Sequence, residues 1–465
     1  MITYPQLLLQ NNLIIWQKCS IIQHENTHMP HFFFQHRRLI LLACGAGVSL
    51  MGLFAVVHYT SQEKQQFVLL SYEMPGGLHP SAPAAAVVEP EMLPLAERSV
   101  TVTLTSDQKD PVTATMSMMD HPEWVIMENG ILGSDERVSA VAVQAFLEQE
   151  KGSPFPVMRI AQILASGIDA KKVLRATTSG VAKPGYVYDT AAIAQQIAQA
   201  LMYEQSDLHF TATYSLPFIT AISADGQAKQ YELLGTGMSD FADSDAGRES
   251  NVHKAIEERV NNVIVPAGAT FSLIDALDAP ITEKKGWKMA LGLFGGGAAL
   301  TVGGGICQSA TTVYRAALLS GLPIVEKRNH SLFVDHYEFY GVGLDATVFP
   351  GFHDVRYKND TGDDLLMQAY TEGVTVYVHF YGRNDGRTAY LDGPYFARSK
   401  NRPKELRALS TYEIGWVRTV TAADGTTKVQ PLIATYSKPV WYSIFKKYDG
   451  ADGMALMTSL KVVVK

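Results

Sequence analysis

Three consecutive glycines, followed by a cysteine and a helix-forming segment, constrain the fold of this chain more than any other stretch. Residues 303–305 are all glycine, and a single isoleucine separates them from Cys307. Residues 309–319 have the composition of a helix, which Gly321 is placed to end. Cys307 is therefore predicted near a helix N-terminus, where unpaired N–H groups and the helix dipole favour a thiolate.

A histidine and an aspartate follow in an order that a catalytic triad can use. His330 comes after a short apolar segment, and Asp345 begins the sequence Asp-Ala-Thr-Val. These residue types can serve as the general base for a cysteine nucleophile and as the group that orients the base. The alternative interpretation is an inert, buried cysteine with an unrelated histidine and a turn aspartate. Nearby residues that can replace either partner are Asp335, His336 and His353.

An uncharged apolar run lies near the N-terminus. Residues 39–57 carry no charged side chain over 19 residues and follow Arg37 and Arg38. This length spans a bilayer, and the two arginines place residues 1–38 in the cytoplasm. We predict an uncleaved single-pass anchor in the cell membrane, with the rest of the chain exported. The alternatives are a cleaved signal peptide, a lipoprotein cysteine at Cys44 and a start at Met29.

Charge and cysteine content exclude several classes of protein. The 465 residues carry a formal charge of −7, without the basic face of a nucleic-acid-binding protein. Cys307 has no disulfide partner outside the cytoplasm, because Cys19 and Cys44 lie in or before the predicted anchor. No cysteine or histidine cluster has zinc-site spacing, and no glycine pattern matches a phosphate-binding loop. We therefore expect no metal, no cofactor and no nucleic-acid partner.

The exported part is predicted to begin with a linker and a small α+β domain. Residues 58–98 are rich in proline and alanine and are typical of a semi-extended linker. Within residues 99–224, alternating apolar residues predict strands at 100–104 and 209–214. Helices are predicted at residues 138–150 and 190–202, the second capped by Asp189.

Residues 231–382 carry a set of motifs that resembles the VanW family. The matching residues are Ser250-Asn251, Asn262, Pro266, Thr270-Phe271-Ser272, Gly303 to Gln308, Tyr314, Gly321-Leu322, Arg328, His330-Ser331, Gly343, Asp345 to Val348, Asp354 and Lys358-Asn359. The family is named from vancomycin-resistance clusters, so the resemblance implies a role at the cell wall without an established reaction. Residues 99–224 are similar in layout to the peptidoglycan-binding domain that often precedes this one, notably at Lys183-Pro184-Gly185 and Leu216-Pro217.

A second similarity concerns transglutaminase-like cysteine proteins, in which cysteine, histidine and aspartate occur in the same order and form a triad. It implies that His330 lies on one strand and Asp345 on the next. Residues 383–465 alternate like strands around a turn at Asp424-Gly425 and are predicted to form a β-rich extension. The predicted fold class is therefore α+β: an anchor, two exported α+β domains, the second transglutaminase-like, and a β-rich extension.

These patterns lead to two hypotheses of different classes. In the first, Cys307 attacks an amide carbonyl of peptidoglycan or wall peptide while His330 moves the proton and Asp345 holds the imidazole. This describes a hydrolase or acyl transferase linked to glycopeptide resistance or wall maintenance. The predicted substrate-binding residues are Gly303, Gly304, Gly305, Gln308, Arg328 and Ser331. In the second hypothesis, the same pocket binds wall peptide without catalysis. A thiol sensor is disfavoured because no second exported cysteine can resolve an oxidised one.

Overall fold

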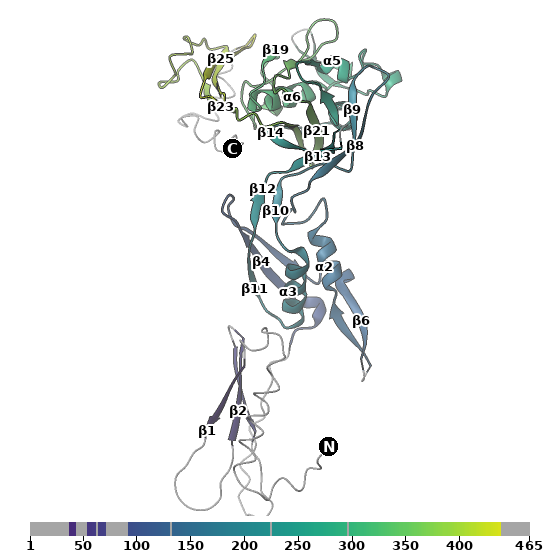
Figure 1. The fold of residues 1–465 in the computed structure, drawn as a ribbon, viewed down its shortest axis with the longest axis vertical. Coiled ribbons are helices and arrows are strands. Elements are labelled where there is room, and N and C mark those ends of the chain that lie inside the picture. Colours follow the sequence, from purple (N-terminus) through teal and green to yellow (C-terminus); the bar gives the residue numbers. More distant parts are fainter. Residues whose placement is uncertain are drawn as a thin grey trace, which may run out of the picture. The chain divides into compact units, whose positions relative to one another are not determined.

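The chain divides into two compact units, Met1–Glu91 and Met92–Lys465. A computed structural model describes residues 37–42, 54–61, 64–70, 92–130, 133–223, 226–294 and 297–438 (Figure 1). The last part of the predicted C-terminal extension, residues 439–465, lies outside the described residues.

The first unit contains a small antiparallel sheet in the order β1-β2-β3. Its strands are β1 (Arg37–Leu42), β2 (Phe54–Ser61) and β3 (Lys64–Leu70). The predicted anchor at residues 39–57 overlaps β1 and β2 at its two ends, and residues 43–53 between them lie outside the described residues. Among the residues that are described, no helix is both long and apolar enough to cross a membrane. The single-pass anchor stays a prediction.

The second unit begins with a three-stranded sheet covered by two helices. The sheet order is β11-β4-β5, with β11 parallel to β4 and β5 antiparallel to it. Alternation along β4 buries Val100, Val102 and Leu104 against the helices, as the sequence pattern predicts. The elements of this part are β4 (Ser99–Thr105), β5 (Val112–Ser117), β6 (Val125–Gly130), β7 (Gly133–Val138), α2 (Ala140–Leu147), β10 (Gly185–Val187), α3 (Thr190–Met202), β11 (Asp207–Thr211) and β12 (Thr213–Ser215).

Both predicted helices of this part are confirmed, one with changed bounds. Helix α3 begins where Asp189 accepts a hydrogen bond from the amide of Ala192 at 2.9 Å. Helix α2 is shorter than the predicted range 138–150, because Ser139 caps its start and it ends at Leu147.

A closed barrel forms the centre of the second unit, in the order β13-β14-β22-β21-β15-β9-β8. Its strands are β8 (Ala161–Ile168), β9 (Leu174–Thr178), β13 (Phe218–Ile222), β14 (Ala228–Asp240), β15 (Val263–Val265), β21 (Leu365–Glu372) and β22 (Thr375–Gly382). Neighbouring strands are antiparallel except β13 and β8, whose parallel pairing closes the barrel. The barrel therefore contains strands from both sides of the predicted boundary between residues 224 and 231.

Helix α6 (Cys307–Leu319) packs against β14 and β22 on the outside of this barrel (Figure 1). Two glycines of β14 allow the close approach, because a Cβ at Gly235 or Gly237 would overlap the helix backbone at Ser320 or Thr312. Alternate residues of β22, such as Val378 and Phe380, face the core under α6. Their neighbours on the strand point the other way, into the barrel.

Shorter elements surround α6 and connect it to the barrel. They are α4 (Ala246–His253), a π-helix (Lys254–Val260), β16 (Thr270–Ser272), α5 (Leu273–Ala276), the hairpin β17 (Met289–Phe294) and β18 (Gly297–Val302), β19 (Ile324–Glu326) and β20 (Arg356–Lys358). Strands β16, β20 and β19 form a small sheet in that order.

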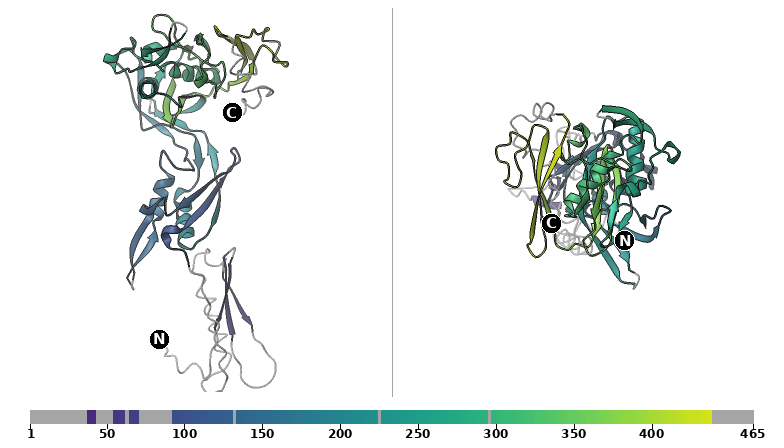
Figure 2. Two further views of the ribbon diagram at one scale, coloured as in Figure 1. Left: turned by 180° about the vertical axis from the view of Figure 1, so that it is seen from behind. Right: turned by 90° about the horizontal axis from the view of Figure 1, so that it is seen from above.

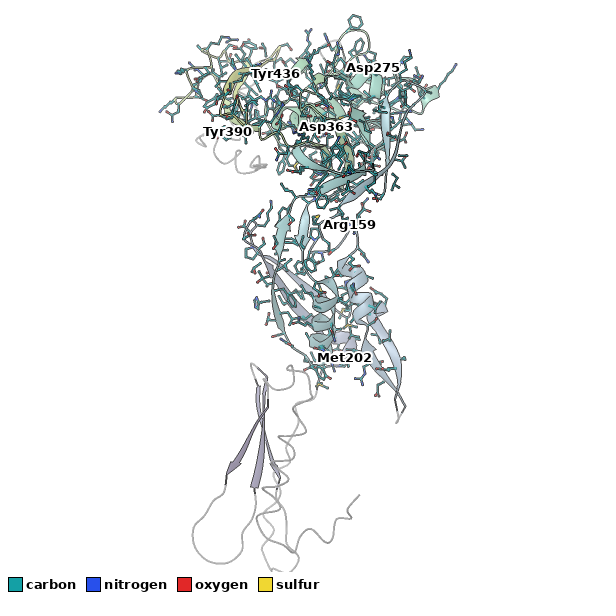
Figure 3. All side chains as sticks on the ribbon, viewed as in Figure 1. Arg159, Met202, Asp275, Asp363, Tyr390 and Tyr436 are labelled. Carbon is teal, nitrogen blue, oxygen red and sulfur yellow. The ribbon has the colours of Figure 1, made fainter. Side chains whose placement is uncertain are left out.

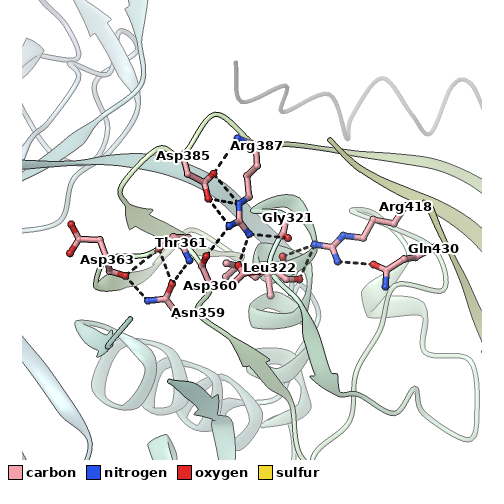
Figure 4. A network of polar contacts seen from close by, with 11 residues as sticks. Gly321, Leu322, Asn359, Asp360, Thr361, Asp363, Asp385, Arg387, Arg418 and Gln430 are labelled. Atoms are coloured by element: carbon pink, nitrogen blue, oxygen red, sulfur yellow. Dashed lines mark hydrogen bonds and ion pairs between the residues drawn. The ribbon is translucent and has the colours of Figure 1, made fainter. Parts of the chain in front are cut away.

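The C-terminal extension is a three-stranded antiparallel sheet, β23 (Thr388–Tyr395), β24 (Glu413–Thr421) and β25 (Thr427–Thr435), which confirms the predicted β-rich character (Figure 2). Arg418 of β24 is buried and donates a hydrogen bond to the carbonyl of Leu322, just after α6 (Figure 4). It also donates to the carbonyls of Ala317 and Leu318 at the end of the helix. The Ala317 and Leu318 carbonyls also accept the backbone N–H groups of Leu322 and Gly321, so Arg418 adds to the C-terminal cap of α6. Arg387 pairs with Asp360 and Asp385 beside it.

Candidate active site

The glycine turn predicted before Cys307 exists, and its shape explains the three glycines. Gly303 and Gly305 have φ angles of 82° and 97°, which side chains other than glycine rarely adopt. Gly304 lies so close to Ala290 of β17 that a Cβ would overlap the backbone there. The side-chain amide of Asn251 donates to the Gly304 carbonyl at 2.9 Å. The turn is therefore fixed from two sides, and it delivers Cys307 to the first position of α6.

The thiol of Cys307 is partly exposed and has polar neighbours. Its Sγ atom lies 3.3 Å from Thr347 Oγ1 and 3.8 Å from the carbonyl oxygen of Val348. The imidazole of His330 is also near enough to the thiol to lower its pKa. The cysteine thus meets the Asp-Ala-Thr-Val segment directly, through its last two residues.

His330 and Asp345 form a buried, tightly bonded pair. The Asp345 Oδ2 atom lies 2.7 Å from His330 Nδ1 and also accepts the backbone N–H of His330 at 2.8 Å. The two residues are 5% and 3% exposed. Because Nδ1 is engaged by the carboxylate, Nε2 is the ring nitrogen left for the thiol. The ring of Tyr337 lies against the imidazole with its centroid 5.3 Å away.

The charges of the three groups support one another. Burial would lower the pKa of His330, but its hydrogen bonds to Asp345 and Cys307 outweigh burial and raise the pKa to about 9. Burial would raise the pKa of Asp345, but the bond to His330 lowers that pKa to about 2. The pKa of Cys307 is also lowered, because the bond to His330 and its positive charge outweigh burial. Relative to the isolated side chains, these shifts favour a thiolate beside an imidazolium.

Both His330 and Asp345 lie in loops, so the strands implied for them by the transglutaminase similarity are wrong. The loops are held by side chains instead of by a sheet ladder. Arg315 of α6 donates to the carbonyls of Met238, Gly341 and Leu344, which fixes the segment leading to Asp345. Burial lowers the pKa of this arginine to about 10. The hydrogen bonds of this guanidinium therefore hold the loop in place, where bonds between paired strands were expected.

The other predicted site residues lie in different surroundings. Gln308 is fully buried; its Oε1 accepts from Arg248 at 2.7 Å, and its Nε2 donates to Ser239 and to the Asp240 carbonyl. Both ends of its side-chain amide are thus hydrogen-bonded to groups of the protein. Arg328 and Ser331 are exposed beside His330.

Tyr436, in the C-terminal extension, was not among the predicted site residues. Tyr436 is 4% exposed, and its hydroxyl donates to Asp345 Oδ1 at 2.6 Å. The signal for it was weak, because a tyrosine just after a predicted strand is ordinary and lies 91 residues from its partner.

The fold and the site define an α+β protein with a cysteine at the start of one helix outside its barrel and, in nearby loops, a histidine bonded to an aspartate. Residues 247–381 match the family described as VanW like protein. These residues therefore form a VanW-like domain, as the motifs at residues 231–382 predict.

A relative from Bacillus subtilis (strain 168), "Uncharacterized protein YoaR", is 31% identical over 150 residues. The match covers 32% of this chain and 48% of that protein, so it spans about half of the relative's length. No solved structure matches the chain.

Proposed function

We propose that this protein acts in the cell envelope on peptidoglycan or wall peptide, with Cys307 as the nucleophile of an amide hydrolase or acyl transferase. The contact that carries the proposal is the 2.7 Å bond between His330 Nδ1 and Asp345, which leaves the other ring nitrogen for the thiol. A histidine that is merely structural has no need of both a buried carboxylate and a thiol as partners.

The chemistry follows from the charges of these groups. The thiolate of Cys307 attacks the carbonyl carbon, forming a C–S bond, and the negative charge moves to the carbonyl oxygen. When the C–N bond breaks, the imidazolium of His330 gives its proton to the leaving amine. The resulting thioester is attacked by water or by another amine, whose proton His330 accepts, and the C–S bond then breaks to release the Cys307 thiolate. Asp345 keeps the imidazole in place and stabilises its positive charge.

The helix start offers a donor for the developing oxyanion. Among the described residues of this turn, the amides of Gln308 and Ser309 bond to the carbonyls of Gly305 and Ile306, whereas the amide of Cys307 has no backbone acceptor. This amide adjoins the nucleophile and lies at the positive end of the α6 dipole. It is a better candidate for the oxyanion than the buried side chain of Gln308.

The cell-wall assignment rests on family membership, and the export of the domain rests on the predicted anchor at residues 39–57. Peptidoglycan offers peptide amides outside the membrane, where Cys307 would lie. The rival function is a binding protein in which the same residues hold wall peptide and the thiol is inert.

The first test is the pH dependence of iodoacetamide alkylation at Cys307 in the full chain, read by peptide mass spectrometry so that Cys19 and Cys44 do not interfere. We expect alkylation well below the ordinary thiol pKa of about 8.5. In His330→Ala, the rate at pH 7 should fall at least about tenfold, because the thiolate loses its counter-charge. His209→Ala, which removes an exposed histidine on β11, should leave the rate unchanged.

The second readout is an acyl adduct on Cys307 after incubation with soluble peptidoglycan fragments. An adduct in the wild type that is absent in Cys307→Ser would support acyl transfer. A thiol that titrates normally in both the wild type and the His330 variant would refute the enzyme and favour the binding protein.

A further inference from the structure

The last described segment of the C-terminal extension runs alongside the loop that carries His330. The Asn329 side chain donates to the Thr435 carbonyl at 2.7 Å, on one side of the histidine. On the other side, the Ser437 backbone N–H donates to the Ser331 carbonyl at 2.7 Å. The extension thus brackets His330, and Tyr436 lies between the two contacts.

Tyr436 completes the set of donors around the catalytic carboxylate. Asp345 Oδ2 accepts both bonds from His330, and Asp345 Oδ1 accepts the Tyr436 hydroxyl. A carboxylate held through only one oxygen can turn about its terminal torsion, which has a broad energy profile. The tyrosine therefore holds the second oxygen and fixes the plane of the group.

We propose that Tyr436 is a positioning residue for the Cys307, His330 and Asp345 site, and that the C-terminal extension is a working part of that site. This inference rests on the proposed function. It extends the site beyond the family domain, whose match ends at residue 381. The extension then does more than cap α6 through Arg418.

The ring of Tyr436 also packs, since it meets the ring of Phe333 edge-on at 5.7 Å. A purely structural tyrosine would act through this packing alone. Tyr436→Phe keeps the ring and removes only the hydroxyl, so it separates the two roles. The matched control is Tyr390→Phe, which removes a hydroxyl from a tyrosine of the same extension that is 56% exposed (Figure 3).

The experiment measures the pH profile of Cys307 alkylation by iodoacetamide in the full chain for both variants. Without the hydroxyl, Asp345 turns away from Nδ1, the imidazolium is less stable, and the thiolate loses part of its counter-charge. We expect the thiol pKa to rise by about one unit and the alkylation rate at low pH to fall about tenfold in Tyr436→Phe. Tyr390→Phe should retain the wild-type profile.

Two further variants keep the test decisive if Tyr436→Phe folds poorly. Ser437→Pro removes the backbone donor to Ser331 at an exposed position and should raise the thiol pKa in the same direction by a smaller amount. In an Asp345→Asn background, Tyr436→Phe should add almost nothing, because a residue acting through Asp345 has no further effect once that carboxylate is gone.

The outcomes separate this inference from the proposed function. A wild-type thiol with an ordinary pKa would overturn both. A lowered pKa that is unchanged in Tyr436→Phe and Ser437→Pro would overturn only the role of Tyr436. An additive loss in the Asp345→Asn background would likewise reduce Tyr436 to packing.

Discussion

Two buried histidines in this protein have opposite electrostatic surroundings. His330 lies beside α6 with a carboxylate and a thiol as partners, and its pKa is raised to about 9. His379 lies on β22 and is 1% exposed. Its ring nitrogens lie 2.8 Å from Thr236 Oγ1 and 2.9 Å from the Tyr370 hydroxyl. Burial and the charge of Lys183 lower its pKa to about 3.

The difference shows that burial alone does not set the direction of a histidine's pKa shift. Both rings are enclosed and both are fully bonded, but only His330 faces groups that become anionic. His379 is surrounded by hydroxyls, which satisfy a neutral imidazole and give no reason to charge it. These surroundings fit the proton transfer proposed for His330, whereas His379 bonds to side chains of the two neighbouring barrel strands.

The largest effect that tests this comparison is expected from the acidic partner of His330. Asp345→Asn removes the charge that supports the imidazolium, and we expect the formation of an acyl adduct to fall about a hundredfold. Thr236→Val removes a neutral partner of His379 and should leave adduct formation within about twofold of the wild type. The measurement is adduct accumulation on Cys307 with soluble peptidoglycan fragments. Equal losses of adduct formation in the two variants would mean that the partners of His330 and His379 matter equally for the reaction.

An intermediate effect is expected at high pH. His330 must carry its proton to release an amine, and its pKa is about 9. Above that pH, acyl transfer from an amide should fall about tenfold per unit. Alkylation by iodoacetamide needs only the thiolate and should stay on its plateau. The measurement is the rate of each reaction from pH 8 to 10 on one preparation of protein. A decline of both rates together would indicate unfolding instead of loss of the proton donor.

Local patterns predicted much of the site, because the thiol and its turn are continuous in sequence. Gly303 to Cys307 encode their own turn, and Gly321, with a φ angle of 72°, follows the helix that it was predicted to end. The pairing of His330 with Asp345 was also predicted from residue order and motif. Only 15 residues separate the two, so both lie within the same stretch of recognisable sequence.

Contacts between distant segments could not be predicted in the same way. Arg418 reaches α6 from β24, and Tyr436 reaches the site from the residue just after β25. Apolar alternation along these strands does not predict which groups their polar side chains contact. The barrel was missed for a similar reason, because strand periodicity gives each strand but not its partner. Strands at His330 and Asp345 were expected from the residue order shared with transglutaminase-like proteins, and residue order does not decide whether a segment pairs in a sheet.

The smallest effect on the thiol is expected from His379 itself, whose role should appear in stability instead. The unfolded chain protonates this residue below its ordinary pKa of 6.5, whereas the folded protein resists until about pH 3. Stability linked to His379 is therefore intact above pH 6.5 and is lost as the pH falls toward 3, with a loss of about 3 kcal/mol by pH 4.

The variant His379→Phe has no group that titrates in this range, but it leaves the hydroxyls of Thr236 and Tyr370 without their hydrogen-bond partner. This loss costs about 1 to 3 kcal/mol at pH 7. In urea denaturation, the variant should be less stable than the wild type at pH 7 and equally or more stable at pH 4. Its rate of Cys307 alkylation at pH 7 should stay within about twofold of the wild-type rate. His209→Phe, at an exposed position, controls for the loss of a histidine. A stability gap that is the same at both pH values would show that His379 is charged in the folded protein, and the contrast with His330 would disappear.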